Sequence, residues 1–187
     1  MKRTFLALEL PSQLKIQFSN IIRELQSSFP KSVKWVDAEN LHITLQFIGD
    51  TQENDISDLS EYFKEIFAEV PVLKFSNPEI QIIPGRNPRL IWIEMTTENK
   101  DIFKAAKKIK NKLHQMDYIP DKKSLRFHAT LGRIKKRLPD FFISQILSKK
   151  ISVLDFEVSE AAFYESILRP EGPVYYEIEK YGLGKNV

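Results

Sequence analysis

Two segments that begin with histidine, residues 42–48 and 128–134, constrain the fold of this chain more than any other feature. Both start with the pattern H-x-T-L and both end in isoleucine. The chain has 3 histidines, so chance does not readily account for two of them opening the same pattern. A strand-like stretch precedes each segment, and a helix-like stretch precedes that strand. The repeat predicts two similar halves related by a pseudo-twofold axis, each presenting one histidine-bearing strand.

The first of these segments alternates between polar and apolar residues, as a half-buried strand does. Because successive side chains of a strand point to opposite faces, His42 and Thr44 should lie side by side on one face, together with Gln46. The other face should carry four core residues, Leu41, Ile43, Leu45 and Phe47.

Hydrophobic periodicity and turn residues divide the rest of the chain into alternating helices and strands. We expect helices at 12–29, 54–69, 100–116 and 140–147. Strands are expected at 4–10, 33–36, 72–76, 79–83, 90–96, 126–134, 152–164 and 174–183, with a Pro/Gly loop at 84–88. This order predicts an α+β fold with antiparallel sheets, in which residues 1–187 form one domain of two interleaved lobes.

Composition excludes several kinds of chemistry. The chain has no cysteine, so disulfides, thiolate metal sites and cysteine nucleophiles are ruled out. It contains neither a G-x-S-x-G elbow nor a phosphate-binding glycine loop, and it has only 6 glycines. The short apolar run at the N-terminus is interrupted by Glu9 and lacks the features of a signal peptide. We therefore expect a soluble, cytoplasmic protein that acts as a monomer, without a membrane span.

The net charge of +3 is unevenly distributed, because residues 100–137 hold 13 basic residues against 3 acidic ones. This excess is either the solvated face of a lysine-rich helix or an electrostatic footprint for a polyanion. Charge alone does not choose between the two. His114, on the polar side of that helix, is interpreted as a surface residue.

The doubled H-x-T pattern suits chemistry at a phosphodiester. In-line attack at phosphorus needs a base on one side and an acid on the other, and His42 and His128 can supply both near neutral pH. The hydroxyls of Thr44 and Thr130 can donate to phosphate oxygens. A lone H-x-T would be a structural histidine in a strand, but two facing pairs favour catalysis. A metal site is disfavoured, because His/Thr pairs without carboxylates on the same face are poor ligands.

Several further segments resemble one family. They are RTFLAL at 3–8, KWV at 34–36, ENLHITLQFIG at 39–49, PRLIW at 88–92, HATLGR at 128–133, YES at 164–166 and GPVY at 172–175. Together they resemble the RNA 2',3'-cyclic phosphodiesterases, historically called 2'-5' RNA ligases, within the two-histidine (2H) phosphoesterase superfamily. The resemblance covers nearly the whole chain. It implies two pseudo-symmetric lobes, each an antiparallel sheet with helices, and an active-site groove between them.

The resemblance also implies a reaction, the hydrolysis of RNA 2',3'-cyclic phosphate ends to 2'-phosphomonoesters without a metal or cofactor. In that reaction His42 is the proton donor and His128 the proton acceptor. Thr44, Thr130 and Arg133 would hold the phosphate. By strict alternation Arg133 faces away from His128 and is a solvated arginine, unless a bend at Gly132 redirects it.

This chain departs from the family pattern at three places. Phe127 replaces the usual proline before the second histidine, Asp117 replaces a glycine, and residues 81–84 differ from the usual aromatic segment. Phe127 and Trp35 are then the candidates to stack on a nucleobase. Two alternative functions stay open, a 2'-5' RNA ligase or 2'-5' phosphodiesterase using the same residues, and an RNA-binding module of the same fold.

Overall fold

The structure is a computed structural model of the whole chain, and it describes residues 1–28, 32–83, 89–121, 124–152 and 155–184. The fold is α+β, as expected, and both histidine-bearing segments are strands. In chain order the elements are β1 (Lys2–Glu9), α1 (Ser12–Ser28), β2 (Val33–Trp35), a 3-10 turn (Ala38–Asn40), β3 (His42–Thr51), α2 (Asp55–Ala68), β4 (Leu73–Ile82), β5 (Leu90–Thr96), α3 (Lys100–Gln115), β6 (His128–Ile134), α4 (Asp140–Leu147), β7 (Asp155–Val158), β8 (Glu160–Leu168) and β9 (Pro173–Gly182).

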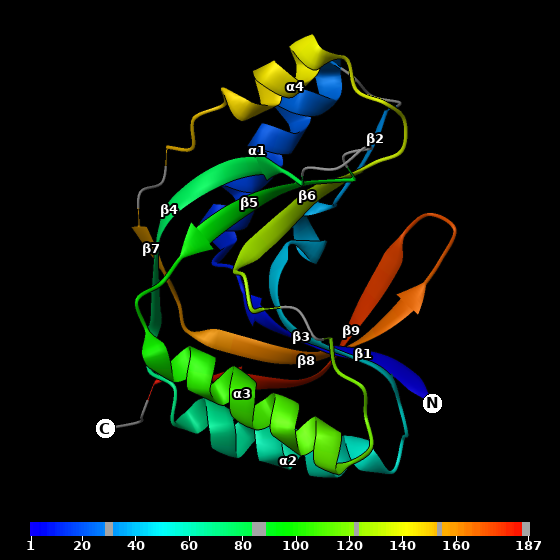
Figure 1. Cartoon of the computed structure of the whole chain (residues 1–187), viewed down its shortest axis with the longest axis vertical. Coiled ribbons are helices and arrows are strands. Elements are labelled where there is room, and N and C mark those ends of the chain that lie inside the picture. Colours follow the sequence, from blue (N-terminus) through cyan, green and yellow to red (C-terminus); the bar gives the residue numbers. More distant parts are fainter. Residues whose placement is uncertain (29–31, 84–88, 122–123, 153–154, 185–187) are drawn as a thin grey trace.

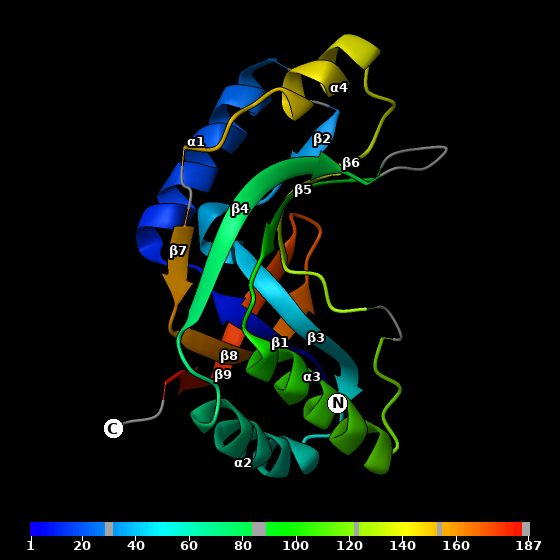
Figure 2. The same ribbon diagram turned by 60° about the vertical axis from the view of Figure 1, so that its left-hand side comes forward.

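The strands form one 9-stranded sheet in the order β7-β4-β5-β6-β3-β1-β8-β9, with β2 paired to β6. The sheet curls strongly, so that its two halves face different directions (Figures 1 and 2). The two lobes expected from the sequence are therefore halves of one continuous sheet. They meet at β3 and β6, where Ile43 lies opposite Ala129.

Two helices cover the outer face of each half (Figures 1 and 2). α1 and α4 pack against the half that contains β2, β4, β5 and β6, whereas α2 and α3 pack against the half that contains β1, β3, β8 and β9. α1 follows β1 in the chain but covers the other half of the sheet. Its apolar residues recur at helical spacing, which buries one stripe in the core: Leu14, Phe18, Ile21, Ile22 and Leu25.

Three expected strands differ from the structure. The stretch 152–164 is not one strand, because β7 pairs with β4 in one half while β8 pairs with β1 in the other. The chain changes partner at Ser159, whose carbonyl accepts a hydrogen bond from Leu183 N at 2.7 Å. Conversely, the stretches 72–76 and 79–83 join into β4, which passes through Asn77 at a φ of +51°. Alternation in the sequence does not reveal where a strand changes its partner.

Two other expectations, Phe29 at the end of the first helix and the loop 84–88, lie outside the described residues. Within the part of the chain that the structure describes, no helix has the length and apolar character needed to cross a membrane.

Candidate active site

A β-bulge follows the threonine in each histidine-bearing strand. On β3, Thr44 opposes Ala7 and Gln46 opposes Leu6, which leaves Leu45 as an extra residue. On β6, the pairs Thr130–Trp92 and Gly132–Ile91 leave Leu131 as the extra residue in the same way. A bulge places two consecutive residues against one and inverts the alternation beyond it. The pseudo-symmetry of the two H-x-T-L segments therefore extends to their backbones.

Because of the bulges, the side chains that follow each of these leucines lie on the face opposite to the one expected from alternation. Gln46 is buried, at 9% exposure, and Phe47 is 52% exposed, which is the reverse of the simple alternation. On β6 the bulge acts on Arg133, which opposes Leu90 of β5 while Thr130 opposes Trp92. Leu90 and Trp92 are two residues apart on a regular strand, so they share a face. Arg133 thus lies on the same face as Thr130 and His128.

The two H-x-T pairs lie next to each other on one face of the sheet. Because Ile43 lies opposite Ala129, the antiparallel register places Thr130 beside His42 and Thr44 beside His128. Ile43 and Ala129 are fully buried on the helix-covered face, so these four side chains point the other way, into the groove. The result is a square of two imidazoles and two hydroxyls, with each histidine diagonal to the other.

Both imidazoles are held in the same orientation by main-chain carbonyls. His42 Nδ1 lies 2.8 Å from the carbonyl oxygen of Asn40, and His128 Nδ1 lies 3.0 Å from that of Arg126. A carbonyl oxygen only accepts, so each Nδ1 carries the proton and donates it. This leaves each Nε2 free to exchange a proton in the groove, where His42 Nε2 lies 3.0 Å from Thr44 Oγ1.

Aromatic rings pack against both histidines and restrict their rotation. The ring centroid of His42 lies 5.1 Å from that of Phe5 and 5.3 Å from that of Tyr175, which meets it edge-on. His128 packs on Trp92 at 4.0 Å between centroids. The indole N–H of Trp92 is buried and has no hydrogen-bond partner among the described residues.

Burial is the main influence on the protonation of both histidines. It lowers the pKa of His42, and the hydrogen bond to the Asn40 carbonyl and the charge of Glu9 work in the opposite direction. Burial likewise lowers the pKa of His128, opposed by the Arg126 carbonyl and by Glu94. Burial thus favours the neutral form of both imidazoles, which suits a general base, whereas a general acid has to hold its proton against this effect.

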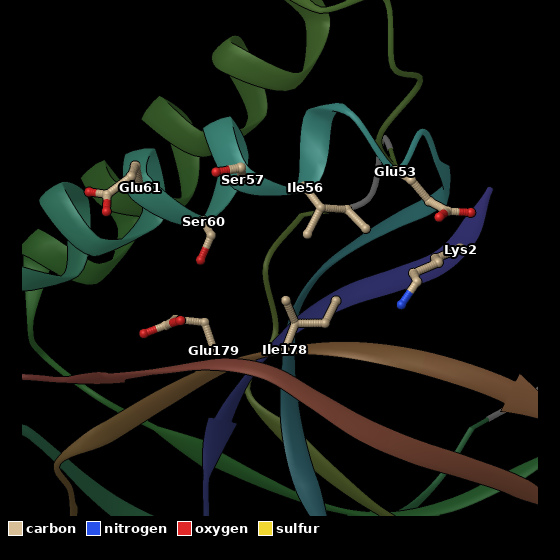
Figure 3. A pocket seen from close by; sticks show the side chains of 8 residues that line it. All are labelled: Lys2, Glu53, Ile56, Ser57, Ser60, Glu61, Ile178 and Glu179. Atoms are coloured by element: carbon tan, nitrogen blue, oxygen red, sulfur yellow. The ribbon is translucent and has the colours of Figure 1, made fainter.

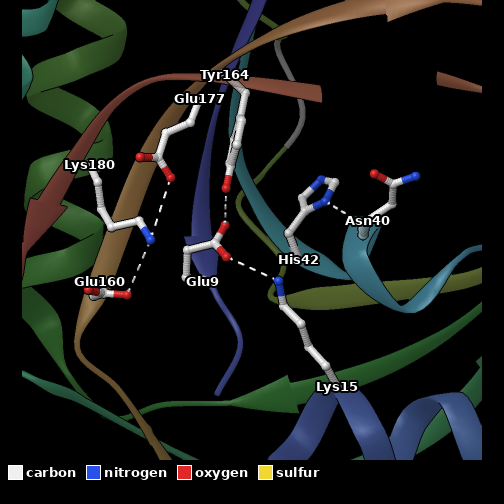
Figure 4. Close-up of polar contacts among 8 residues, drawn as sticks. All are labelled: Glu9, Lys15, Asn40, His42, Glu160, Tyr164, Glu177 and Lys180. Atoms are coloured by element: carbon white, nitrogen blue, oxygen red, sulfur yellow. Dashed lines mark hydrogen bonds and ion pairs between the residues drawn. The ribbon is translucent and has the colours of Figure 1, made fainter. Parts of the chain in front are cut away.

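Two carboxylates beside the histidines are site residues that the sequence reasoning missed. Glu9 of β1 opposes His42, and Glu94 of β5 opposes His128. Glu9 accepts a hydrogen bond from the Tyr164 hydroxyl at 2.8 Å and pairs with Lys15 at 3.1 Å, beside the His42 ring (Figure 4). The premise that no carboxylate shares the histidine face was therefore wrong. A signal existed in the sequence, since each glutamate lies between two apolar residues at or near the end of its strand, in Leu8-Glu9-Leu10 and Ile93-Glu94-Met95.

The groove has an acidic end next to His42. A pocket of about 620 Å³ opens there between the 3-10 turn and the β8–β9 hairpin, and Tyr164 and Tyr175 lie in its wall. Its lining contains one arginine, Arg169, and five carboxylates: Glu9, Asp37, Glu39, Glu171 and Glu177. A second hollow of about 490 Å³ between α2 and β9 contains neither motif histidine (Figure 3). The pocket beside His42 is thus the one that belongs to the groove.

The residues proposed for base stacking do not face the groove. Phe127 is 4% exposed and packs against Phe75 and Phe103, so it belongs to the core. Trp35 opposes Gly132, on the face opposite Arg133, and packs against the core. For Phe127, simple alternation already indicates this face, because Phe127 directly precedes His128. The face of Trp35 depends on its partner strand, where Gly132 follows the bulge at Leu131.

The lysine-rich helix α3 lies under the half-sheet that carries β3, packed against α2 (Figure 1). Lys104 pairs with Asp101 at 2.9 Å, and Lys108 pairs with Glu69 of α2 at 3.0 Å. His114 is exposed on the same helix, as expected. These pairs favour the solvated-face interpretation for this part of the basic excess.

Known proteins with the same architecture carry phosphoesterase names. A family model described as "LigT like Phosphoesterase" matches residues 8–92. An RNA 2',3'-cyclic phosphodiesterase of Archaeoglobus fulgidus is 29% identical over 181 residues, covering 96% of this chain and 99% of the relative. One of Thermotoga maritima is 29% identical over 175 residues, covering 92% of this chain and 91% of the relative.

Solved structures agree on the fold. A protein of Thermus thermophilus superposes with a TM-score of 0.82 at 21% identity, covering 99% of this chain and 100% of its own. Escherichia coli LigT in its apo form gives a TM-score of 0.71 at 19% identity, with 97% of each chain covered. The fold is that of the LigT-like solved structures, and the facing H-x-T pairs are the feature expected of two-histidine phosphoesterases. The chain is similar to the LigT-like phosphoesterases over residues 8–92 and to the two RNA 2',3'-cyclic phosphodiesterases over nearly its whole length.

Proposed function

We propose that this protein hydrolyses RNA 2',3'-cyclic phosphate ends to 2'-phosphomonoesters, using His42 and His128 as acid and base without a metal ion. The observation that carries the proposal is the square of His42, Thr44, Thr130 and His128 on one face of the sheet. The near-full-length similarity to relatives named RNA 2',3'-cyclic phosphodiesterase supports the substrate class.

The reaction needs a proton to be removed on one side of the phosphorus and supplied on the other. A cyclic phosphate seated over the square has His128 Nε2 on the side of the attacking water and His42 Nε2 on the side of O3'. His128 takes a proton from the water as its oxygen bonds to phosphorus. The P–O3' bond breaks, and His42 gives its proton to O3'. The products are a 2'-phosphomonoester and a 3'-hydroxyl, and proton exchange with solvent resets the pair.

The remaining groups stabilise charge on the phosphate. Thr44 and Thr130 alternate with the histidines in the square, so their hydroxyls can donate to the non-bridging oxygens from both strands. Arg133 enters the same face through the bulge at Leu131 and supplies a permanent positive charge. The rest of an RNA strand should leave over β6 and not toward the acidic pocket beside His42, which repels further phosphates.

Metal independence rests on how the nearby carboxylates are engaged. Glu9 is paired with Lys15 and Tyr164, and Glu94 is paired with Arg126, so a cation would have to compete with these partners. Among the described residues, no group of three or more His, Asp or Glu side chains is placed to hold a metal ion. The donors left in the square are two imidazoles and two hydroxyls, which make a poor set for a divalent ion.

The deciding experiment is turnover of 2',3'-cyclic mononucleotides, with and without exhaustive chelation. We expect activity to survive EDTA. His42→Ala and His128→Ala should each lose about 10²–10⁴-fold in kcat, the range typical of general acid–base catalysis. His114→Ala is the matched control, because it removes an exposed imidazole remote from the groove.

Two results would contradict the proposal. Loss of activity in EDTA, with rescue by a divalent ion, would move the protein to a metal-dependent class. Near-normal turnover by either motif variant would remove that histidine from the mechanism. Tight binding of cyclic phosphate ends by an unaltered protein that does not turn them over would favour an RNA-binding module.

A further inference from the structure

We propose that Glu9 and Glu94 are a matched pair of positioning residues, each placing a negative charge beside one of the two motif histidines so that the imidazole can hold its proton. The inference rests on the proposed function for its catalytic meaning, but its physical claim concerns the histidines alone. The pseudo-symmetry of β3 and β6, which extends to the next strand outward on each side, supports this claim. These two strands, β1 and β5, each carry one of the glutamates.

The two carboxylates occupy equivalent places in the sheet. β1 flanks β3 and β5 flanks β6, so the four central strands run β5-β6-β3-β1. Glu9 opposes His42 across the first outer pair, and Glu94 opposes His128 across the second. Directly opposed residues of antiparallel strands project from the same face, with Cβ atoms about 4.5–5.5 Å apart. Each histidine therefore has a threonine on one side and a glutamate on the other.

Each carboxylate is tied down by its own partners. Glu9 is held between the Tyr164 hydroxyl and the Lys15 ammonium (Figure 4), and its side chain is 13% exposed. Glu94 receives two hydrogen bonds from the Arg126 guanidinium, at 2.8 and 2.6 Å, and its side chain is 24% exposed. These bonds hold the charges in place without drawing them away from the imidazoles.

The carboxylates act through space and not as hydrogen-bond relays. The Nδ1 atoms of His42 and His128 already donate to main-chain carbonyls, and the Nε2 atoms face the groove. The Coulombic effect of Glu9 raises the pKa of His42, and that of Glu94 raises the pKa of His128. This effect opposes burial, which favours the neutral form of both imidazoles.

Other charged groups near the histidines determine in which direction further substitutions should move each pKa. On the His42 side these are Lys15 of α1 and a protonated His128, and both lower the pKa of His42. The phenol rings of Tyr164 and Tyr175 complete that surrounding. On the His128 side the cation is Arg126, which lowers the pKa of His128. Each histidine thus lies next to one carboxylate that raises its pKa, and next to cations that lower it: two for His42 and one for His128.

The test is a histidine titration by NMR on the full chain, which needs no turnover. With 3 histidines in the chain, each imidazole can be followed separately, and exposed His114 is an internal control. Glu9→Gln keeps the shape of the side chain and removes its charge. It should lower the titration midpoint of His42 by about one pH unit, the low end of what a neighbouring ion produces. The midpoint of His128 should stay where it was.

Two further variants test the same claim. One acts on the other histidine, and the other should move the midpoint of His42 in the opposite direction. Glu94→Gln should lower the midpoint of His128 and spare His42. Lys15→Met should raise the midpoint of His42, and Glu9→Asp, which keeps the charge, should restore much of the wild-type value. The matched control is Glu165→Gln, which breaks an ion pair with Lys2 on the opposite face of the same sheet.

Turnover adds a readout in which the two variants behave differently. The acid must be protonated, so Glu9→Gln should move the alkaline limb of the kcat/KM profile to lower pH and narrow the bell. The base must be neutral, so Glu94→Gln should move the acid limb to lower pH and widen it.

Titration midpoints that move no more in Glu9→Gln and Glu94→Gln than in Glu165→Gln would overturn the inference, whatever the activity. Should Glu9→Gln fail to fold, an unmoved or lowered His42 midpoint in Lys15→Met would overturn it equally. Midpoints that shift as expected in a protein without hydrolase activity would support the inference and refute the proposed function.

Discussion

Gly132→Ala adds one methyl group at a closely packed position. It therefore tests whether packing against β2, and not the backbone preference of glycine, determines the stability at this site. Gly132 lies on β6 opposite Trp35 of β2. A Cβ atom there would lie 2.6 Å from Val33 Cγ1 and 3.0 Å from Trp35 Cε3. Carbon atoms in contact sit about 3.5–4.0 Å apart, so Val33 would have to retreat by about 1 Å. Valine is stiff about χ1 and this one is buried, so β2 itself must move.

The expected cost follows from that displacement. Overpacking of this kind destabilises a protein by about 1–3 kcal/mol. For a chain of this size each kcal/mol lowers the melting temperature by about 2–4 °C, so Gly132→Ala should melt roughly 2–12 °C below wild type. The next residue, Arg133, opposes Lys34 of β2 and would move with the strand. A misplacement of about 1 Å can cost up to about 100-fold in kcat/KM.

Thermal unfolding followed by circular dichroism measures the first effect, and turnover of a cyclic nucleotide measures the second. Gly182→Ala is the matched control, because it lies in β9 with nothing within 4 Å of the added Cβ. There alanine should be neutral or stabilising by about 0.5–1 kcal/mol, since glycine loses more backbone entropy on folding. Equal melting temperatures for the two variants would refute the claim that β2 is closely packed at Gly132.

Three further predictions concern the groove. Thr44→Val and Thr130→Val keep the side-chain shape but remove a hydrogen-bond donor, so each should lower kcat by about 10²–10³-fold. An unchanged kcat in both variants would show that the two threonines contribute only to strand structure. Burial lowers the pKa of His42 and His128 in the folded state, so the unfolded chain binds more protons below pH of about 6.5. The free energy of unfolding from urea titrations should therefore fall as pH drops below that value, and less so in His42→Gln. Charge reversal at residues 135–137 should flatten the salt dependence of RNA binding by about 0.7 per lost phosphate contact, and an unchanged slope would assign them to the solvated surface.

The arrangement of the candidate site could be predicted in part from residue types and spacing, and the roles of its residues stay predictions. The doubled H-x-T-L pattern identified His42, Thr44, His128 and Thr130, and period-two alternation correctly put each histidine on the same face as its threonine. These inferences are local, because two residues separated by one always share a face of a regular strand. Alternation in the first strand held as far as Leu45.

Beyond that leucine the alternation failed, and only the tertiary structure shows why. The extra residues, Leu45 and Leu131, exist only relative to the neighbouring strands that they fail to match. A bulge is a property of a pair of strands, so one strand's own sequence does not reveal it. This is the reason that Phe47 was assigned to the core and that strict alternation, without a bend at Gly132, turned Arg133 away from His128.

The chain by itself determined which side chains could do the chemistry and that they would come from two similar halves. Only the tertiary structure decided which residues lie beside these side chains, because the order β5-β6-β3-β1 joins strands that are far apart in sequence. That order sets His42 beside Glu9 and Thr130, and it sets His128 beside Glu94 and Thr44. Such non-local pairing is selected by how well both faces of the whole sheet are packed, and no local pattern contains that information.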